Sequence, residues 1–374
     1  METHHTMPFG IIILVPLFLV TVAGVLFLIA CMAAALEPLL WWAGWSRRSA
    51  VVLLHLDAPV AADSPEPDVD SYIVYLSGAG TMDPTMMEEK ERQFIDLLHS
   101  RLLRSVLITD VFPYSATNNP QLGERRLARL WRYAWRARNT RRRSFFQWLS
   151  VHAQQLRNSL QVAVSGDRRY GPILSYGVSQ VIVAGLLRHG YRFGSDKPVI
   201  LTALSGSGQI SVGCVPILKR LLRRPIWIAS IGGILTDDPG ILETEHVYHL
   251  SGSLDNTQHM PRFFFPGVWP IFTQSAINRA RRQGKITVFD VGPMKHMRQG
   301  DYMSRSATLP NGQRYVDKTI DVLTEIVARI ETEAQAAMSR PEVATPNDWV
   351  SESRVGLSLQ IGRASCRERV CNGV

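Results

Sequence analysis

The sequence predicts an α/β protein built on a doubly wound, mostly parallel β-sheet. Short apolar runs rich in β-branched residues alternate along the chain with stretches of helical periodicity, which is the pattern of strand–helix–strand units. The runs are apolar at successive positions, as expected of strands covered by helices on both faces. With 374 residues, 46% of them hydrophobic, the chain can bury one large core of this kind and still supply a membrane segment.

Residues 1–48 are expected to form a membrane anchor. The apolar run 9–35 exceeds the roughly 20 residues that a helix needs to cross a bilayer, and Glu37 is the one charged residue between positions 8 and 45. The basic pair Arg47-Arg48 follows, and positive charge marks the cytoplasmic flank of a span. We therefore expect a single-pass membrane protein with a cytoplasmic domain. A hairpin of two short spans, broken near Glu37, stays the alternative.

The C-terminal end is set apart from the folded body. Residues 341–360 are expected to be a tail, and residues 361–374 resemble a sequencing-library adapter translated in frame, so they are excluded as a non-native scar. The excluded segment carries three arginines and one glutamate. Without it, the formal net charge falls from +9 to +7.

Residues 49–340 are expected to form one domain. The order of elements in it follows from the alternation of β-like apolar runs and amphipathic helical patterns. Strands are predicted at residues 51–56, 72–76, 105–110, 199–204, 226–231, 247–250 and 286–289. Helices are predicted around residues 94–102, 178–187, 210–222, 269–282 and 316–330.

An arginine-rich insertion interrupts this alternation at about residues 118–165. Residues 121–145 contain nine arginines and one acid, Glu124, and apolar residues such as Leu127 and Trp131 lie on one helical face. A basic amphipathic helix edged with tryptophan fits the surface of an anionic membrane. We interpret the insertion as a basic helical cap that binds anionic lipid. A solvated insertion is the alternative, and nucleic-acid binding is not expected because no nucleic-acid motif accompanies the charge.

The predicted strand 199–204 leads into Ser205-Gly-Ser-Gly208 and then into a helix. A serine in a sharp turn between a strand and a helix is the setting of a nucleophile in an α/β sheet. The turn requires small residues two positions before and two positions after the nucleophile. Ser205 meets this condition with Ala203 and Ser207, whereas Gln209 excludes Ser207. Ser205 is therefore the predicted nucleophile.

The loop after strand 72–76, Ser77-Gly-Ala-Gly80, is glycine-rich. In α/β hydrolases such a loop supplies one backbone N–H to the developing oxyanion, and the residue after the nucleophile supplies the other. The expected donors are Ala79 and Gly206, with Gly80 in place of Ala79 as the fallback. A tight turn without a chemical role is the alternative. A dinucleotide fingerprint is disfavoured because Asp83 stands where its third glycine is needed.

A serine nucleophile needs a base, and the base needs an acid. Asp255 directly follows strand 247–250, and His296 follows the last strand, 286–289. The imidazole removes the proton from the serine hydroxyl, and the carboxylate fixes the tautomer and stabilises the imidazolium. Asp237 and Asp238 are the alternative acids. The histidines at 246, 249 and 259 are less suitable bases, because none of them follows the last strand.

No cofactor and no metal are expected. Outside the excluded tail, the cysteines are Cys31 in the apolar N-terminal run and Cys214 on a predicted helix. Two isolated cysteines provide neither a disulfide framework nor a metal-binding spacing.

The chain resembles the α/β-hydrolase superfamily over roughly residues 50–340, and in particular a group of membrane-anchored bacterial α/β hydrolases without an assigned substrate. The motifs that carry the resemblance are Leu204-Ser-Gly-Ser-Gly-Gln-Ile210, Arg169-Tyr-Gly-Pro172, Tyr248-His-Leu-Ser-Gly-Ser-Leu-Asp255 and Gly292-Pro-Met-Lys-His296.

This resemblance implies hydrolase chemistry with Ser205, Asp255 and His296 as the triad. The chain departs from the superfamily at the nucleophile turn and at Ser77, where many relatives carry a histidine before the oxyanion glycine. The expected function is a membrane-anchored serine hydrolase that cleaves a carboxylic ester or thioester, with a lipid-like substrate favoured. The alternative is a catalytically silent domain of the same fold that serves as a membrane interaction module.

Overall fold

The protein is described here from a computed structural model, in which residues 9–40, 66–81, 84, 87–114, 156–297 and 299–338 are placed. Six strands form one sheet in the order β2-β1-β3-β4-β5-β6, and every neighbouring pair is parallel. The strands are β1 Ser71–Leu76, β2 Ser105–Ile108, β3 Val199–Leu204, β4 Ile226–Ile231, β5 His246–Gly252 and β6 Ile286–Gly292. The predicted α/β class with a parallel sheet is confirmed for this part of the chain.

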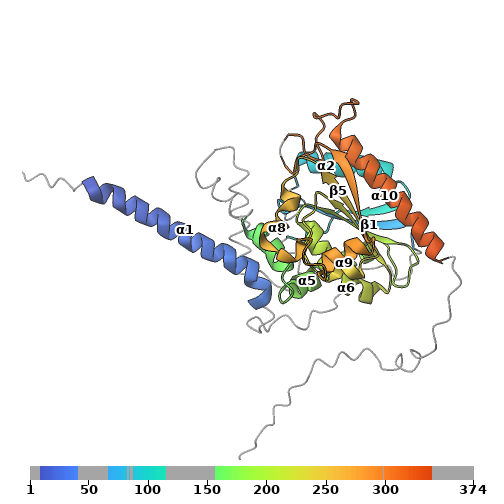
Figure 1. Ribbon diagram of the computed structural model, residues 1–374, viewed down its shortest axis with the longest axis horizontal. Coiled ribbons are helices and arrows are strands. Elements are labelled where there is room, and N and C mark those ends of the chain that lie inside the picture. Colours follow the sequence, from blue (N-terminus) through green and yellow to red (C-terminus); the bar gives the residue numbers. More distant parts are fainter. Residues whose placement is uncertain are drawn as a thin grey trace, which may run out of the picture. The chain divides into compact units, whose positions relative to one another are not determined.

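Helices cover both faces of the sheet (Figure 1). The longer ones in the body are α2 Glu89–Arg101, α5 Gly171–Arg188, α6 Ser207–Leu222, α9 Ala276–Arg282 and α10 Tyr315–Met338. Short helical turns are α7 Gly240–Glu243, η5 Thr257–His259, α8 Pro261–Phe264 and η6 Pro266–Val268. Residues 156–165 are also helical.

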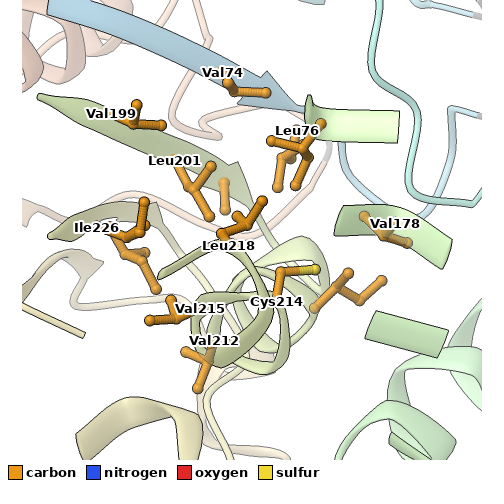
Figure 2. Packing of buried hydrophobic residues seen from close by; sticks show 14 of the residues in the cluster. Val74, Leu76, Val178, Val199, Leu201, Val212, Cys214, Val215, Leu218 and Ile226 are labelled. Carbon is orange, nitrogen blue, oxygen red and sulfur yellow. The ribbon is translucent and has the colours of Figure 1, made fainter. Parts of the chain in front are cut away.

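One face of the sheet packs against α5, α6 and α9. Val74 and Leu76 of β1 and Val199 and Leu201 of β3 point to this face, and α6 contributes side chains that include Val215 (Figure 2). Alternate residues of each strand share a face because the side-chain period of a strand is two. Cys214 is buried in the same cluster and is a free thiol.

The other face packs against α2 and α10. Ile73 and Tyr75, which alternate with the residues of the first cluster along β1, join Phe94 of α2 and Ile320 of α10 in a second cluster. Helix α10 has an apolar residue every third or fourth position, and its buried stripe ends at Ala334. The sheet is thus a middle layer between two helical layers.

Several predicted boundaries differ from the observed ones. Strand β2 ends at Ile108, short of the expected residue 110, and α10 continues to Met338, beyond residue 330. The prediction of one helix over 269–282 is wrong in its first half: α9 begins at Ala276, with Ser275 as its N-cap. The Ser275 side chain accepts a hydrogen bond from the backbone N–H of Asn278, and this caps the helix at that point.

Helix α1, Phe9–Leu40, contains the apolar N-terminal run. It continues through Glu37-Pro38, near which the alternative expectation of a two-span hairpin places a break. Among the described residues, no helix meets the requirements of length and apolarity for a bilayer span. The predicted strand 51–56, most of the arginine-rich insertion and the C-terminal segments 341–360 and 361–374 lie outside the described residues.

The order of the strands reverses beside β1. The chain passes from β1 to β2 on one side and then returns to β3 on the other side. In open parallel sheets, ligands bind at the carboxyl ends of strands where the order reverses in this way. The loops after β1 and β3 meet at this point, and they carry the predicted oxyanion loop and Ser205.

Candidate active site

Ser205 occupies a strained turn between β3 and α6. Its φ is +58°, and in the described part of the chain the other non-glycine residue with a positive φ is Arg223. Left-handed backbone is unfavourable for residues other than glycine and clusters at functional sites. Ala203 and Ser207, the small residues on either side, are both fully buried, so the steric requirement inferred from the sequence is met.

Backbone hydrogen bonds to the neighbouring strand hold this turn in place. The N–H of Ser205 donates to the carbonyl of Ile231 at 3.0 Å, and the carbonyl of Ser205 accepts from the N–H groups of Gly208 and Ile234, each at 3.0 Å. Because both peptide groups of the turn are fixed by β4 and by α6, the strained conformation is part of the fold.

His296 reaches Ser205 from the loop after β6. Its Nε2 lies 2.6 Å from the Ser205 Oγ, and its Nδ1 lies 2.9 Å and 3.1 Å from Oδ2 and Oδ1 of Asp255. The imidazole is thus held between a hydroxyl and a carboxylate. When Nδ1 carries the proton and donates it to Asp255, Nε2 is left as the acceptor for the serine hydroxyl.

Asp255 is buried and hydrogen-bonded on both carboxylate oxygens. In addition to His296, the hydroxyl of Tyr302 donates to Oδ2 at 2.9 Å, and the N–H of Thr257 donates to Oδ1 at 2.9 Å. Burial acts to raise the pKa of Asp255, but the hydrogen bonds and charge of His296, together with these donors, outweigh it and hold the pKa below its usual range. The acid therefore stays ionised beside His296.

Gly232 allows the close approach of this carboxylate to β4. Its φ is +51°, and a Cβ at this position would lie 2.7 Å from Asp255 Oδ2 and 2.6 Å from the ring of Tyr302. Both the backbone conformation and the space thus require glycine.

The alternative acids have other partners. Asp237 pairs with Arg168 at 2.8 Å and accepts the N–H of Ala276 at the start of α9. Asp238 accepts the side chain of Gln209 and the N–H of Gly240, and burial raises the pKa of Asp238. Within the described contacts, neither carboxylate reaches His296.

The alternative histidines also have partners away from Ser205. His246 is hydrogen-bonded to Thr287 at 2.8 Å, and His249 lies between Ser230 and Gln258. Burial lowers the pKa of both imidazoles. His259 is exposed in η5. The structure thus brings Ser205, His296 and Asp255 together and leaves the other candidates apart.

The predicted oxyanion loop lies against the serine turn. A Cβ built on Gly78 would lie 3.6 Å from the Cβ of Ser205, and the buried Ser207 hydroxyl donates to the carbonyl of Ser77. The Asn158 side chain donates to the carbonyl of Ala79 and so orients the peptide group between Ala79 and Gly80. Among the described hydrogen bonds, none uses the N–H of Ala79 or of Gly206.

A buried glutamate of α2, Glu91, is hydrogen-bonded to the end of this loop. The carboxylate of Glu91 in α2 accepts hydrogen bonds from Thr81, at the end of the loop, and from Tyr75 of β1, both at 3.0 Å. Burial raises the pKa of Glu91, although these hydrogen bonds oppose the rise. Glu91 thus links helix α2 to the end of the loop that faces Ser205.

Sequence reasoning missed the residues that support the site: Tyr302, Gly232, Glu91 and Asn158. None of them lies in a motif. Each reaches the site from an element whose position depends on tertiary packing, so the sequence contains no spacing signal for it.

Exposed apolar side chains surround the acid and base loops. Leu254 and Met297, the neighbours of Asp255 and His296, are 51% and 60% exposed. In the segment that follows the acid, Phe263 and Phe264 are exposed, whereas Val268 is buried in the first core cluster.

The described residues contain no group of three or more histidine, cysteine or acidic side chains arranged to hold a metal ion. No protein-family model, no curated protein and no solved structure matches this chain.

Proposed function

We propose that this protein is a membrane-anchored serine hydrolase of the α/β-hydrolase fold, which cleaves a carboxylic ester or thioester through an acyl-enzyme. The observation that carries the proposal is the hydrogen-bonded series Ser205–His296–Asp255, with the serine at a turn of positive φ. A serine, an imidazole and a buried carboxylate in this arrangement form a nucleophile, its base and the orienting acid.

The strand order supports the fold assignment. The nucleophile follows β3, the acid follows β5 and the base follows β6, so the three residues come from the carboxyl ends of strands on one side of the reversal beside β1. This is the chain order Ser, Asp, His of α/β hydrolases.

In the proposed reaction, the Ser205 Oγ attacks the carbonyl carbon of the substrate while His296 Nε2 takes the hydroxyl proton. The tetrahedral intermediate then expels the alcohol or thiol, which receives that proton from His296, and an ester between Ser205 and the acyl group remains. Water attacks this ester with His296 again as base, releasing the carboxylic acid and restoring the serine. Asp255 stays ionised throughout and stabilises the imidazolium.

The backbone N–H groups of Ala79 and Gly206 are the proposed donors to the oxyanion. Ala79 belongs to the loop that packs on the serine turn, and Gly206 directly follows the nucleophile. Removal of one such donor in other enzymes costs on the order of 10² to 10³ in kcat. Asn158 and Glu91 hold the loop, so we assign them positioning roles.

A lipid-like substrate and a membrane location are part of the proposal. The run 9–35 contains no charged residue, and α1 exposes apolar side chains such as Leu14 and Phe18. The exposed apolar residues beside the acid and base loops suit an acyl chain. Arg47-Arg48 favour a cytoplasmic domain, and the arginine-rich cap favours anionic lipid.

Labelling with a serine-reactive fluorophosphonate tests the proposed chemistry. We expect the full chain to be labelled on the peptide that contains Ser205, and Ser205→Ala to abolish both labelling and ester turnover. Ser207→Ala is the matched control: it removes a neighbouring buried hydroxyl and should retain at least part of the labelling and turnover. A wild-type protein that is folded but unlabelled would instead favour a catalytically silent membrane interaction module.

A further inference from the structure

A cavity lies beside the candidate active site, between the edge of the sheet and the helices that follow β5. It has a volume of about 200 Å³ and is bounded by β5, β6, η5, α8, η6 and α9. None of Ser205, Asp255 and His296 lines it. The cavity is therefore a separate space from the site proposed to carry out hydrolysis.

The interior of the cavity is mainly apolar. Aliphatic side chains line it from the loop after β4, from η6, from α9 and from β6: Leu235, Val268, Ile277, Ile286 and Val288. Val268 and Ile277 are buried, whereas Val288 on the edge strand is 60% exposed and lies at the outside. Such a lining favours a short hydrocarbon group over water.

Two polar residues of the lining, His249 and Gln258, are neutral and already hydrogen-bonded. His249 contacts Ser230 at 3.3 Å and Gln258 at 3.0 Å, and the Gln258 side chain also donates to the carbonyl of Gly252. Burial lowers the pKa of His249, so this imidazole carries no charge near neutral pH. The interior thus supplies no strong charge to a ligand.

Two arginines supply charge to the cavity instead. Arg262 of α8 and Arg281 of α9 both line it, and in the described part of the chain neither forms an ion pair with a carboxylate. Arg281 donates to the side chain of Asn278 at 2.8 Å and to the carbonyl of Val268 at 3.4 Å, both neutral acceptors. Burial and the charge of Arg262 lower the pKa of Arg281.

Several other arginines of the body have carboxylate partners. Arg168 pairs with Asp237, Arg188 with Asp110, and Arg314 with Asp317 at 2.6 Å to 2.8 Å. Two guanidinium groups that share one cavity without a neutralising carboxylate repel each other. A bound anion would remove this repulsion, and a planar guanidinium fork fits a carboxylate in a bidentate manner.

We propose that this cavity binds a small amphipathic carboxylate, with its head group at Arg262 and Arg281 and its hydrocarbon tail among Val268, Ile277 and Val288. The arginines favour an anionic head group, and the apolar interior favours a hydrocarbon tail. The proposal does not rest on the hydrolase activity proposed above.

Isothermal titration of the purified full chain with hexanoate tests the proposal. We expect saturable one-site binding of hexanoate, and affinities at least tenfold weaker for hexanol, which lacks the charge, and for inorganic phosphate, which lacks the tail. Phosphate binding as tight as that of hexanoate would overturn the amphipathic assignment. The absence of any hexanoate binding at millimolar concentration would overturn the site itself.

Variants locate the binding in this cavity. Arg281→Gln should weaken hexanoate at least tenfold, whereas Arg282→Gln, an equal charge loss on the next residue of α9, should leave it unchanged. Val288→Trp should block the tail without disturbing the core, because Val288 is exposed. Equal effects of the two arginine variants, or loss of binding in Ser205→Ala with retention in Arg281→Gln, would show that hexanoate binds elsewhere.

Discussion

Tyr302 donates its hydroxyl hydrogen to Oδ2 of Asp255 at 2.9 Å, and the same hydroxyl oxygen accepts the N–H of Gly252 at 2.8 Å. The tyrosine therefore ties the acid loop to the end of β5. Burial, followed by the charge of Asp255, raises the pKa of Tyr302, so the hydroxyl remains a proton donor at all ordinary pH values. Through this contact, Tyr302 fixes the carboxylate that orients His296.

Tyr302→Phe should lower kcat/KM for an ester substrate by about tenfold, because a hydrogen bond to a charged group is worth about 1.5 to 3 kcal/mol. The acidic limb of the pH–rate profile should also move to higher pH, because Asp255 loses a hydrogen bond that stabilises its ionised form and lowers its pKa. Steady-state kinetics from pH 3 to 9 measure both effects.

Tyr191→Phe is the matched control for Tyr302→Phe. Tyr191 is equally buried, but its hydroxyl has no hydrogen-bond partner among the described residues. Loss of this hydroxyl should leave both the rate and the pH profile unchanged. If the two variants behave alike, the Tyr302 hydroxyl has no part in positioning the acid.

Gly232→Ala should strongly reduce both activity and thermal stability. The new methyl group would lie 2.7 Å from Asp255 Oδ2, and the residue would also have to keep a φ of +51°. Gly312→Ala shares the positive φ, at +83°, but its methyl group would meet nothing within 4 Å. In this control, the free energy of unfolding should therefore fall only by the cost of the backbone strain, about 1 to 2 kcal/mol.

Differential scanning calorimetry and ester kinetics on the two glycine variants separate strain from displacement of the acid. Activity that falls equally in both would contradict the role of Gly232 as space for Asp255.

Glu91 should make the protein less stable as the pH rises. Its pKa in the folded state lies above the ordinary value of 4.5, so its contribution to stability is fully present below pH 4.5 and is lost as the pH rises through the folded pKa. Glu91→Gln removes this titration. Relative to wild type, the variant should therefore become more stable on going from pH 4 to pH 8.

Melting temperatures of the wild type and Glu91→Gln across this pH range check the prediction. The comparison isolates Glu91, because Asp255, whose lowered pKa acts in the opposite direction, is present in both proteins. A difference in melting temperature that does not change with pH would show that Glu91 does not titrate with a raised pKa.

The arginine-rich cap should bind anionic lipid. Each basic residue near an anionic surface contributes about 1 kcal/mol, and the attraction falls off within a Debye length. The chain without residues 1–48 should therefore sediment with phosphatidylserine liposomes at low salt and be released at high salt. Four arginines of the cap can be changed to glutamine together: Arg125, Arg126, Arg129 and Arg132. This variant should bind the liposomes more weakly but still hydrolyse a small soluble ester.

Circular dichroism verifies that the shortened chain is folded before the lipid assay. If the folded chain does not bind anionic liposomes at low salt, the cap is only a solvated insertion.

The sequence by itself determined the fold class and the candidate residues of the site. Strand and helix periods are local properties of the chain, so the runs at 199–204 and 226–231 predicted strands at the observed positions. The turn at Ser205 requires small residues two positions before and after the serine, which is a local property. The acid and the base must follow later strands. These constraints were sufficient to choose Ser205, Asp255 and His296, although Asp237 and Asp238 remained open.

The tertiary structure decided what the local rules left open. Of the three candidate acids, Asp255 is the one whose carboxylate reaches His296. This contact depends on the register between β5 and β6. Tyr302 and Gly232 gained their significance from contacts with Asp255, which lies in another segment of the chain, and Arg262 and Arg281 from lining one cavity. Such contacts depend on the packing of whole helices and strands, and no residue spacing in the sequence encodes them.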